Sequence, residues 1–132
     1  MYQIRDIASM IDAQVMGQAP LTIDWLLTDS RSLCFPENTL FFALRSERGD
    51  GHRYIHQLYN RGVRAFVVDT LPSQPCPEAV FLLVPSPLAA LQRLAMEHRK
   101  RFQLPVVGIA GSNGKTTVKE WLYQMLSPDY AV

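Results

Sequence analysis

A glycine-rich turn followed by Lys-Thr-Thr is the stretch of this 132-residue sequence whose residue types are best suited to chemistry. An apolar run at 106–110 leads into the turn, and a helical pattern continues after it from Val118 to Leu126. Strand, glycine turn and helix in this order are typical of a nucleotide phosphate loop, in which backbone N–H groups close around phosphate oxygens. The predicted phosphate-binding residues are Gly111, Ser112, Asn113, Gly114, Lys115, Thr116 and Thr117.

Two residues of this loop have side chains that can act on the phosphates. Lys115 can reach the β- and γ-phosphates, and the Thr116 hydroxyl can hold Mg²⁺. The strict pattern has a glycine five residues before Gly114, where this chain has Ile109, so the match is to a shorter form. The alternative is a plain strand-to-helix turn, which does not explain why Lys-Thr-Thr follows the glycine.

A polar cluster at residues 28–31 follows a strand predicted over 23–27. Its residues are Thr28, Asp29, Ser30 and Arg31. Ligands gather at strand ends in α/β sheets, so these hydroxyl, carboxylate and guanidinium groups are candidates for binding. On residue types alone a simple turn is the favoured alternative, because Asp and Ser bond readily to their own backbone.

A second polar loop, residues 45–52, follows the apolar run 40–44. It contains Arg45, Asp50, Gly51 and His52, and a helix that includes Ile55 and Leu58 begins after it. A charged loop of this kind is usually solvated surface. If the two strands are neighbours, however, both loops can line one cleft.

Other apolar runs complete an α/β pattern. Helices are predicted at 3–12 and 87–102, and strands at 14–17, 65–69 and 80–84. The run ending at Asp69 is similar to a Mg²⁺-binding strand of a nucleotide site, but such a strand normally follows the phosphate loop. Asp69 is therefore expected to cap a turn.

These elements predict a small N-terminal α/β domain with a mixed sheet over 1–84 and a linker helix over 85–104. Residues 105–132 are then the first strand–phosphate loop–helix unit of a P-loop domain, which needs several such units. We therefore expect the chain to be the front part of a longer protein. The strand at 106–110 is expected to be disordered, to fold back, or to associate with a second copy.

Composition excludes several classes of protein. A formal net charge of +1 argues against a nucleic-acid binder, and two cysteines form no metal-binding pattern. The N-terminus shows no signal-peptide pattern, and no apolar run is long enough to span a membrane. The expectation is a cytoplasmic protein with free thiols.

The polar loops and the glycine turn together resemble the Mur ligases of peptidoglycan synthesis. The motifs that carry the resemblance are Thr28-Asp29-Ser30-Arg31, Phe41-Phe42-Ala43-Leu44-Arg45, Asp50-Gly51-His52, the glycine turn and the Lys119-Glu120 pair after it. Their order and spacing are similar to those of the same motifs in the ligases that act late in the pathway. The resemblance covers nearly the whole chain.

The resemblance implies an ATP-dependent ligase that adds D-alanyl-D-alanine to a UDP-N-acetylmuramoyl-tripeptide through an acyl phosphate. It implies that residues 28–31, Arg45 and the turn 50–52 bind the UDP end of the substrate. It also implies that the turn 111–117 binds ATP, with Lys115 catalytic and Thr116 on Mg²⁺. Alternatives are a Mur ligase that adds the third amino acid, a folate polyglutamate ligase, or a non-catalytic UDP-sugar-binding module.

Two residues depart from the family pattern. Ala110 stands where many relatives have Thr, and Ser46 stands where relatives often have Gly. The sequence also lacks the central metal-binding carboxylates and the C-terminal domain of such ligases. We therefore expect these 132 residues alone to be inactive.

Overall fold

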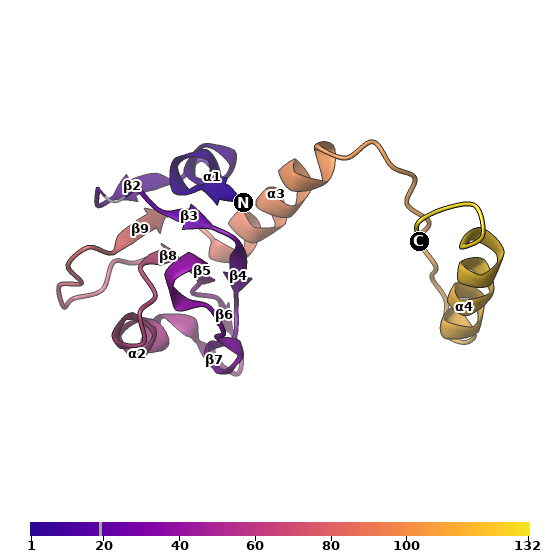
Figure 1. Ribbon diagram of the computed structural model, residues 1–132. Coiled ribbons are helices and arrows are strands. Elements are labelled where there is room, and N and C mark those ends of the chain that lie inside the picture. The colour runs from indigo at the N-terminus through magenta and orange to yellow at the C-terminus, as the bar shows by residue number, and fades with distance from the viewer. Residues whose placement is uncertain (19) are drawn as a thin grey trace. The chain divides into compact units, whose positions relative to one another are not determined.

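The protein is described here from a computed structural model that covers residues 1–18 and 20–132. The chain forms two compact units, Met1–Phe102 and Gln103–Val132 (Figure 1). The first unit holds every described sheet and three α-helices, and the second holds one α-helix. Each unit is considered by itself.

A five-stranded mixed sheet forms the centre of the first unit. Four neighbouring strands run parallel, and β2 pairs antiparallel to β9 at one edge, as the sequence predicts for a mixed sheet. In spatial order the strands are β2 (Gln14–Met16), β9 (Val80–Leu83), β8 (Ala65–Val68), β5 (Thr39–Phe42) and β4 (Trp25–Leu27). Two short antiparallel pairs accompany this sheet, β1 (Tyr2–Gln3) with β3 (Thr22–Ile23) and β6 (Arg45–Ser46) with β7 (Gly49–Asp50).

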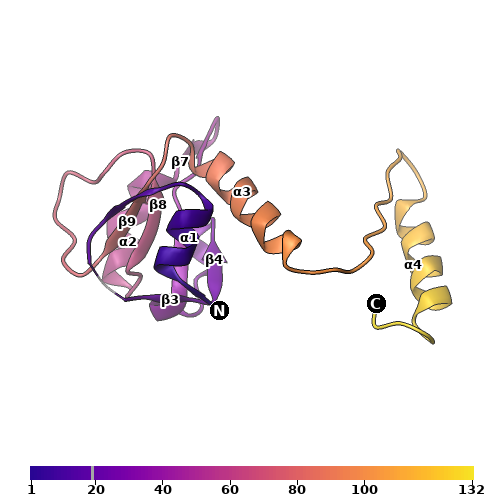
Figure 2. The same cartoon turned by 90° about the horizontal axis from the view of Figure 1, so that it is seen from above.

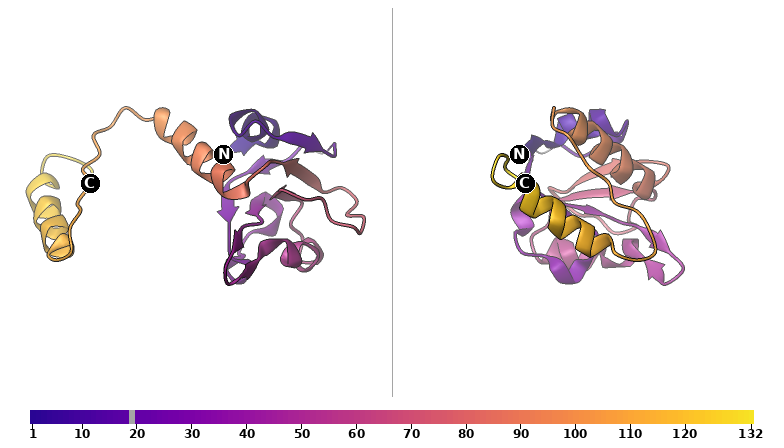
Figure 3. Two further views of the ribbon diagram at one scale, coloured as in Figure 1. Left: turned by 180° about the vertical axis from the view of Figure 1, so that it is seen from behind. Right: turned by 90° about the vertical axis from the view of Figure 1, so that its right-hand side faces the viewer.

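Helices cover both faces of the sheet. Helices α1 (Ile4–Met10) and α3 (Pro87–Lys100) lie together on one face, and α2 (Ile55–Asn60) lies on the other (Figures 1 and 2). The same three layers are visible from behind (Figure 3, left). This layering explains why the central strands read as continuous apolar runs, because both of their faces are buried.

Each face has its own apolar core, because successive residues of a strand point to opposite sides. Leu40 and Phe42 pack with α1 and α3, whereas Phe41 packs with α2. Phe66 lies in the α2 core, stacked on Phe81 with ring centroids 5.3 Å apart and edge-on to Phe41 at 6.3 Å. It is completely buried.

Helix α3 belongs to the first unit. The Ser86 hydroxyl accepts the backbone N–H of Ala89 at 3.2 Å, and Pro87 occupies the first turn, as the sequence predicts for the helix start. Ala90 and Leu94 are buried against the sheet and α1. Helix α3 therefore packs against the rest of the first unit.

The strand predicted over 23–27 is in fact two strands. β3 pairs with β1, and β4 pairs with β5, with Asp24 between them. The backbone N–H of Asp24 donates to the carbonyl of Asn38 at 2.9 Å, and the Asn38 side-chain amide donates back to the Asp24 carboxylate at 3.0 Å. These bonds mark the point where the chain changes partner.

The second unit contains the predicted helix but not the predicted strand. Helix α4 spans Lys115–Leu126, three residues longer at its start than the apolar pattern. Residues 106–110 form no strand, and Val106 and Val107 are exposed. A strand requires a neighbour for its backbone groups, and this unit supplies none. Pairing of residues 106–110 with a second copy stays a prediction.

In the described residues, 1–18 and 20–132, no helix combines the length and the apolar character needed to cross a membrane. Cys34 and Cys76 are free thiols, as the sequence predicts.

Candidate functional site

Four charged or polar side chains meet where the parallel strands end. Arg45 and the turn 50–52 follow β5, and Asp69 follows β8. These two strands are parallel neighbours, so their carboxyl ends lie at the same edge of the sheet. Arg45, Asp50, His52 and Asp69 form one network, called here the Arg45 network.

Arg45 is the centre of this network. Its Nε and Nη2 donate to the two oxygens of Asp69 at 2.7 and 2.8 Å, in the forked geometry that suits a guanidinium and a carboxylate. Its Nη1 donates to Asp50 at 2.9 Å. The arginine therefore ties the hairpin β6–β7 to the end of β8.

His52 lies between the two carboxylates. Its Nδ1 is 2.6 Å from Asp50 Oδ1, and its Nε2 is 3.1 Å from Asp69 Oδ1. The backbone N–H of Asp69 also points at Nε2, at 3.2 Å. His52 and Asp69 are the least exposed side chains of the network, at 13% and 18%.

The network shifts the pKa values of its acids. Hydrogen bonds from Arg45 are the main cause that lowers the pKa of Asp69 to about 2. For Asp50, burial opposes ionisation, but hydrogen bonds from the backbone and ring of His52 still hold its pKa below the ordinary value. Asp69 in turn raises the pKa of Arg45. Both carboxylates are therefore ionised at neutral pH.

Gly51 allows the loop to approach the sheet. Its backbone N–H donates to the carbonyl of Leu44 at 2.8 Å. A Cβ at this position would lie 2.9 Å from the Leu44 nitrogen and 3.1 Å from the Ala43 Cα. Asp50 stabilises the following short 3-10 helix by accepting the backbone N–H of His52 at 3.0 Å. The Asp-Gly-His sequence thus has a local structural reason.

The first polar loop lies at the end of β4, the neighbour of β5. Asp29 accepts the backbone N–H of Arg31 at 3.0 Å and so begins a short 3-10 helix, Ser30–Ser32. The Arg31 guanidinium donates to both oxygens of the same carboxylate, and these bonds lower the pKa of Asp29 to about 2. The favoured alternative of a turn is therefore what forms, with Thr28, Ser30 and Arg31 exposed or half-buried around it.

The two loops share one edge of the sheet, as neighbouring strands require. Arg61, at the end of α2, donates from Nη1 to the carbonyl of Ser30 at 3.1 Å and so holds the first loop. Arg31 and Arg45 are each paired with carboxylates. In the described part of the chain, no ion pair joins a carboxylate to Arg48 of the second loop or to Arg53 of the 3-10 helix after it, so these two cations remain available to an anionic ligand.

Asp69 is the member of this site that the sequence does not identify. It was expected to cap a turn, but this is wrong, since its carboxylate accepts from Arg45 and from the Thr70 hydroxyl. The sequence signal that could have identified Asp69 is its position directly after an apolar strand. The sequence does not show that this strand lies beside β5, which precedes Arg45.

The glycine turn has the backbone geometry of a phosphate loop. Gly111 and Gly114 have φ angles of +148° and +77°, which favour glycine. Helix α4 begins at Lys115 without a side-chain cap, so its first N–H groups can face a phosphate. Lys115 Nζ donates to the Gly111 carbonyl and closes the turn on itself. The residues present therefore fit a nucleotide phosphate. To bind a phosphate, the Lys115 side chain would have to leave the Gly111 carbonyl.

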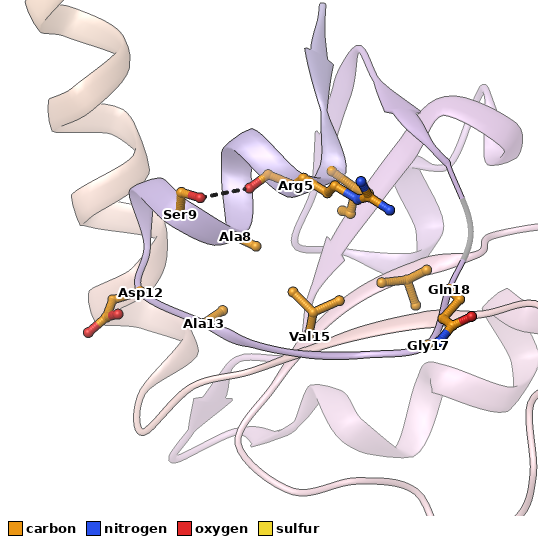
Figure 4. Close-up of a pocket in the computed structure, with 10 residues that line it drawn as sticks. Arg5, Ala8, Ser9, Asp12, Ala13, Val15, Gly17 and Gln18 are labelled. Carbon is orange, nitrogen blue, oxygen red and sulfur yellow. Dashed lines mark hydrogen bonds between the residues drawn. The ribbon is translucent and has the colours of Figure 1, made fainter.

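A cavity of the first unit lies away from the Arg45 network. It has a volume of about 530 Å³ and lies between α1 and β2, at the sheet edge opposite β4 (Figure 4). Its charged residues, Arg5 and Asp12, lie at opposite ends (Figure 4). Across residues 1–18 and 20–132, no three His, Cys, Asp or Glu side chains are placed to hold a metal ion.

Sequence comparison finds ligases of cell-wall precursor synthesis. The chain is 35% identical over 132 residues to the UDP-N-acetylmuramoyl-tripeptide–D-alanyl-D-alanine ligase of Bacillus subtilis, covering 98% of this chain and 28% of the relative. It is 37% identical over 118 residues to the UDP-N-acetylmuramoyl-L-alanyl-D-glutamate–2,6-diaminopimelate ligase of Geobacter metallireducens, covering 87% and 22%. No protein-family model matches the chain.

Structural comparison finds the same ligases. MurF from Acinetobacter baumannii matches with a TM-score of 0.85 and 30% identity, over 97% of this chain and 28% of that one. MurF ligase from Thermotoga maritima, solved in complex with ADP, matches with a TM-score of 0.65 and 31% identity, over 79% and 23%. The chain thus spans about a quarter of the length of the proteins that it matches. By sequence and by fold, it is a homologue of the N-terminal part of the Mur ligases.

Proposed function

We propose that this chain is the front part of an ATP-dependent ligase that adds D-alanyl-D-alanine to a UDP-N-acetylmuramoyl-tripeptide. The observation that carries the proposal is the match to such ligases over 98% of the chain, with both polar loops at one sheet edge. ATP supplies the phosphoryl group that activates the substrate carboxylate. The enzyme would work in the cytoplasm, where nucleotide sugars and ATP are found.

In this proposal residues 1–84 bind the UDP end of the substrate. The binding groups are Thr28, Asp29, Ser30, Arg31, Arg45, Asp50, Gly51 and His52. Because the reacting carboxylate is far from the UDP group, a separate domain that holds this group turns remote binding into positioning. Residues 85–104, most of which form α3, connect this domain to the ATP-binding part.

Residues 105–132 would begin the ATP-binding domain. Gly111 to Gly114 and Thr117 would surround the phosphates with backbone and hydroxyl groups, and Thr116 would hold Mg²⁺. Lys115 would neutralise charge on the transferring phosphoryl group. Helix α4 supports this assignment, since its Trp121 and Met125 are 63% and 72% exposed and the unit has no buried core. Such a short helix is marginal without packing partners.

The addition of 2,6-diaminopimelate is a second candidate function. The match to the Geobacter ligase favours it, because that ligase too is named for a UDP-N-acetylmuramoyl substrate. Amide formation by the whole protein with each amine would decide.

Calorimetric titration of the 132-residue chain tests the binding assignment. We expect a UDP-N-acetylmuramoyl-tripeptide to bind with a Kd on the order of 100 μM, about −5.5 kcal/mol, because only one domain holds it. ATP should give little heat, since its loop lacks the rest of the domain. Tight ATP binding together with no binding of the UDP ligand would mean that the front domain is wrongly assigned.

The same chain should make no amide bond. Incubation with UDP-N-acetylmuramoyl-tripeptide, D-alanyl-D-alanine, ATP and Mg²⁺ should yield neither product nor ADP above the enzyme-free rate, because the chain spans only about a quarter of the length of such ligases. Mass spectrometry of the nucleotide peptide is the measurement. Product that scales with the chain's concentration would contradict the assignment of the catalytic machinery.

A further inference from the structure

All three nitrogens of the Arg45 guanidinium donate to carboxylates of the Arg45 network. Nε and Nη2 bind Asp69, and Nη1 binds Asp50. The network holds two carboxylates for one guanidinium, so the charge of Arg45 is balanced within it. Besides its assigned place among the binding groups, Arg45 therefore supports the loop.

Asp69 holds two members of this network at once. Its carboxylate binds Arg45 through both oxygens, and its backbone N–H points at His52 Nε2 at 3.2 Å. Asp50 Oδ1 lies 2.6 Å from the other ring nitrogen. The imidazole is therefore fixed at both nitrogens, and one of the two contacts comes from the end of β8.

The order of the strands shows which neighbour of β5 holds the second loop. β5 lies between β4 and β8, so the loop after β5 could lean towards either neighbour. Arg45 and His52 draw it towards β8, through Asp69. In the described part of the chain, no side-chain hydrogen bond or ion pair joins residues 45–52 to residues 28–31. The position of the second loop relative to the first is thus set from the β8 side.

We propose that Asp69 is a positioning residue of the UDP-substrate site. It acts through Arg45 and His52 and holds the loop 45–52 at a fixed distance from the loop 28–31, so that both loops contact one ligand. This inference rests on the proposed function of the front unit.

Asp69→Asn is the variant that tests this role, because it keeps the size of the side chain but removes the charge. We expect its Kd for UDP-N-acetylmuramoyl-tripeptide to rise roughly tenfold in the 132-residue chain. Asp69→Glu should remain within roughly threefold of the unaltered chain, since it restores a carboxylate. Asp12→Asn is the matched control, an exposed aspartate at φ +53° where Asn is well tolerated, and its Kd should not change.

A double-mutant cycle shows whether Asp69 acts through Arg45. Arg45→Gln alone should weaken binding, and adding Asp69→Asn to it should weaken binding little further. Nitrogen-15 NMR gives an independent signature. The Arg45 Nε–H signal should be resolved and slow to exchange in the unaltered chain and in Asp12→Asn, and lost in Asp69→Asn.

Two results of the binding measurements would overturn the inference alone. One is a Kd for Asp69→Asn equal to that of the unaltered chain; the other is a full additive loss in the double variant. If the unaltered chain binds no UDP-muramoyl ligand, the proposed function fails as well. Weaker binding by Asp69→Asn with an unchanged Arg45 Nε–H signal would also contradict positioning through Arg45.

Discussion

Phe66→Ala should lower the free energy of unfolding of the first unit by about 3–5 kcal/mol, which is a large part of the stability of a domain of this size. The ring is completely buried, and it joins Phe41 and Phe81 into one aromatic cluster on the α2 face. Truncation removes buried apolar surface and leaves a cavity, because the close-packed sheet beneath it can collapse only partly. Urea unfolding followed by circular dichroism measures the change.

Phe35→Ala is the matched control for this prediction. Phe35 is 55% exposed and stacks on Trp25, with ring centroids 5.3 Å apart. The same truncation there should cost no more than about 1 kcal/mol, since exposed stacking contributes little. If the two variants lost equal stability, Phe66 would not lie in a close-packed core.

The burial of the central strands made them predictable from the sequence. The runs 40–44, 65–69 and 80–84 predict β5, β8 and β9 to within one or two residues. Both faces of these strands are covered by helices, so apolar residues succeed one another without interruption. The parallel direction of these strands can also be expected, because a helix or a long connection separates each from the next along the chain.

Predictions failed where a strand depends on its partner. The run 23–27 has one apolar pattern, yet its two halves pair with β1 and with β5. The run 106–110 has strong strand propensity, yet it has no neighbour and forms no strand. Strand propensity reflects packing against neighbours, which the local sequence does not contain.

The candidate site divides in the same way. Residues 28–31 and 45–52 could be selected as polar loops after apolar strands, and the fold places both at one edge of the sheet. Asp69 could not be assigned, because its partner Arg45 lies 24 positions earlier in the chain. Only the adjacency of β5 and β8 brings them together. Long-range ion pairs of this kind are set by strand order, not by spacing.

The ion pair between Asp69 and Arg45 should make the stability of the first unit depend on pH in the acid range. The fold lowers the pKa of Asp69 from its ordinary value of 3.8 to about 2, and its side chain is 18% exposed. A lowered pKa means that the unfolded chain binds the proton more tightly. The stabilisation is therefore complete above about pH 4 and is lost as the pH falls towards about 2. Its size is about 2 kcal/mol.

Urea unfolding of the unaltered chain and of Asp69→Asn, at several pH values from 7 to 2, measures this contribution. The asparagine is similar to the protonated aspartate, so the difference between the two should be largest at neutral pH and should shrink towards zero near pH 2. Asp29→Asn is the control, because the pKa of Asp29 is lowered equally, to about 2, but its ion pair is exposed. Solvent screening should make its effect on stability small. If the difference for Asp69→Asn stayed constant between pH 7 and pH 2, the Asp69 carboxylate would not be stabilised by Arg45 in the folded chain.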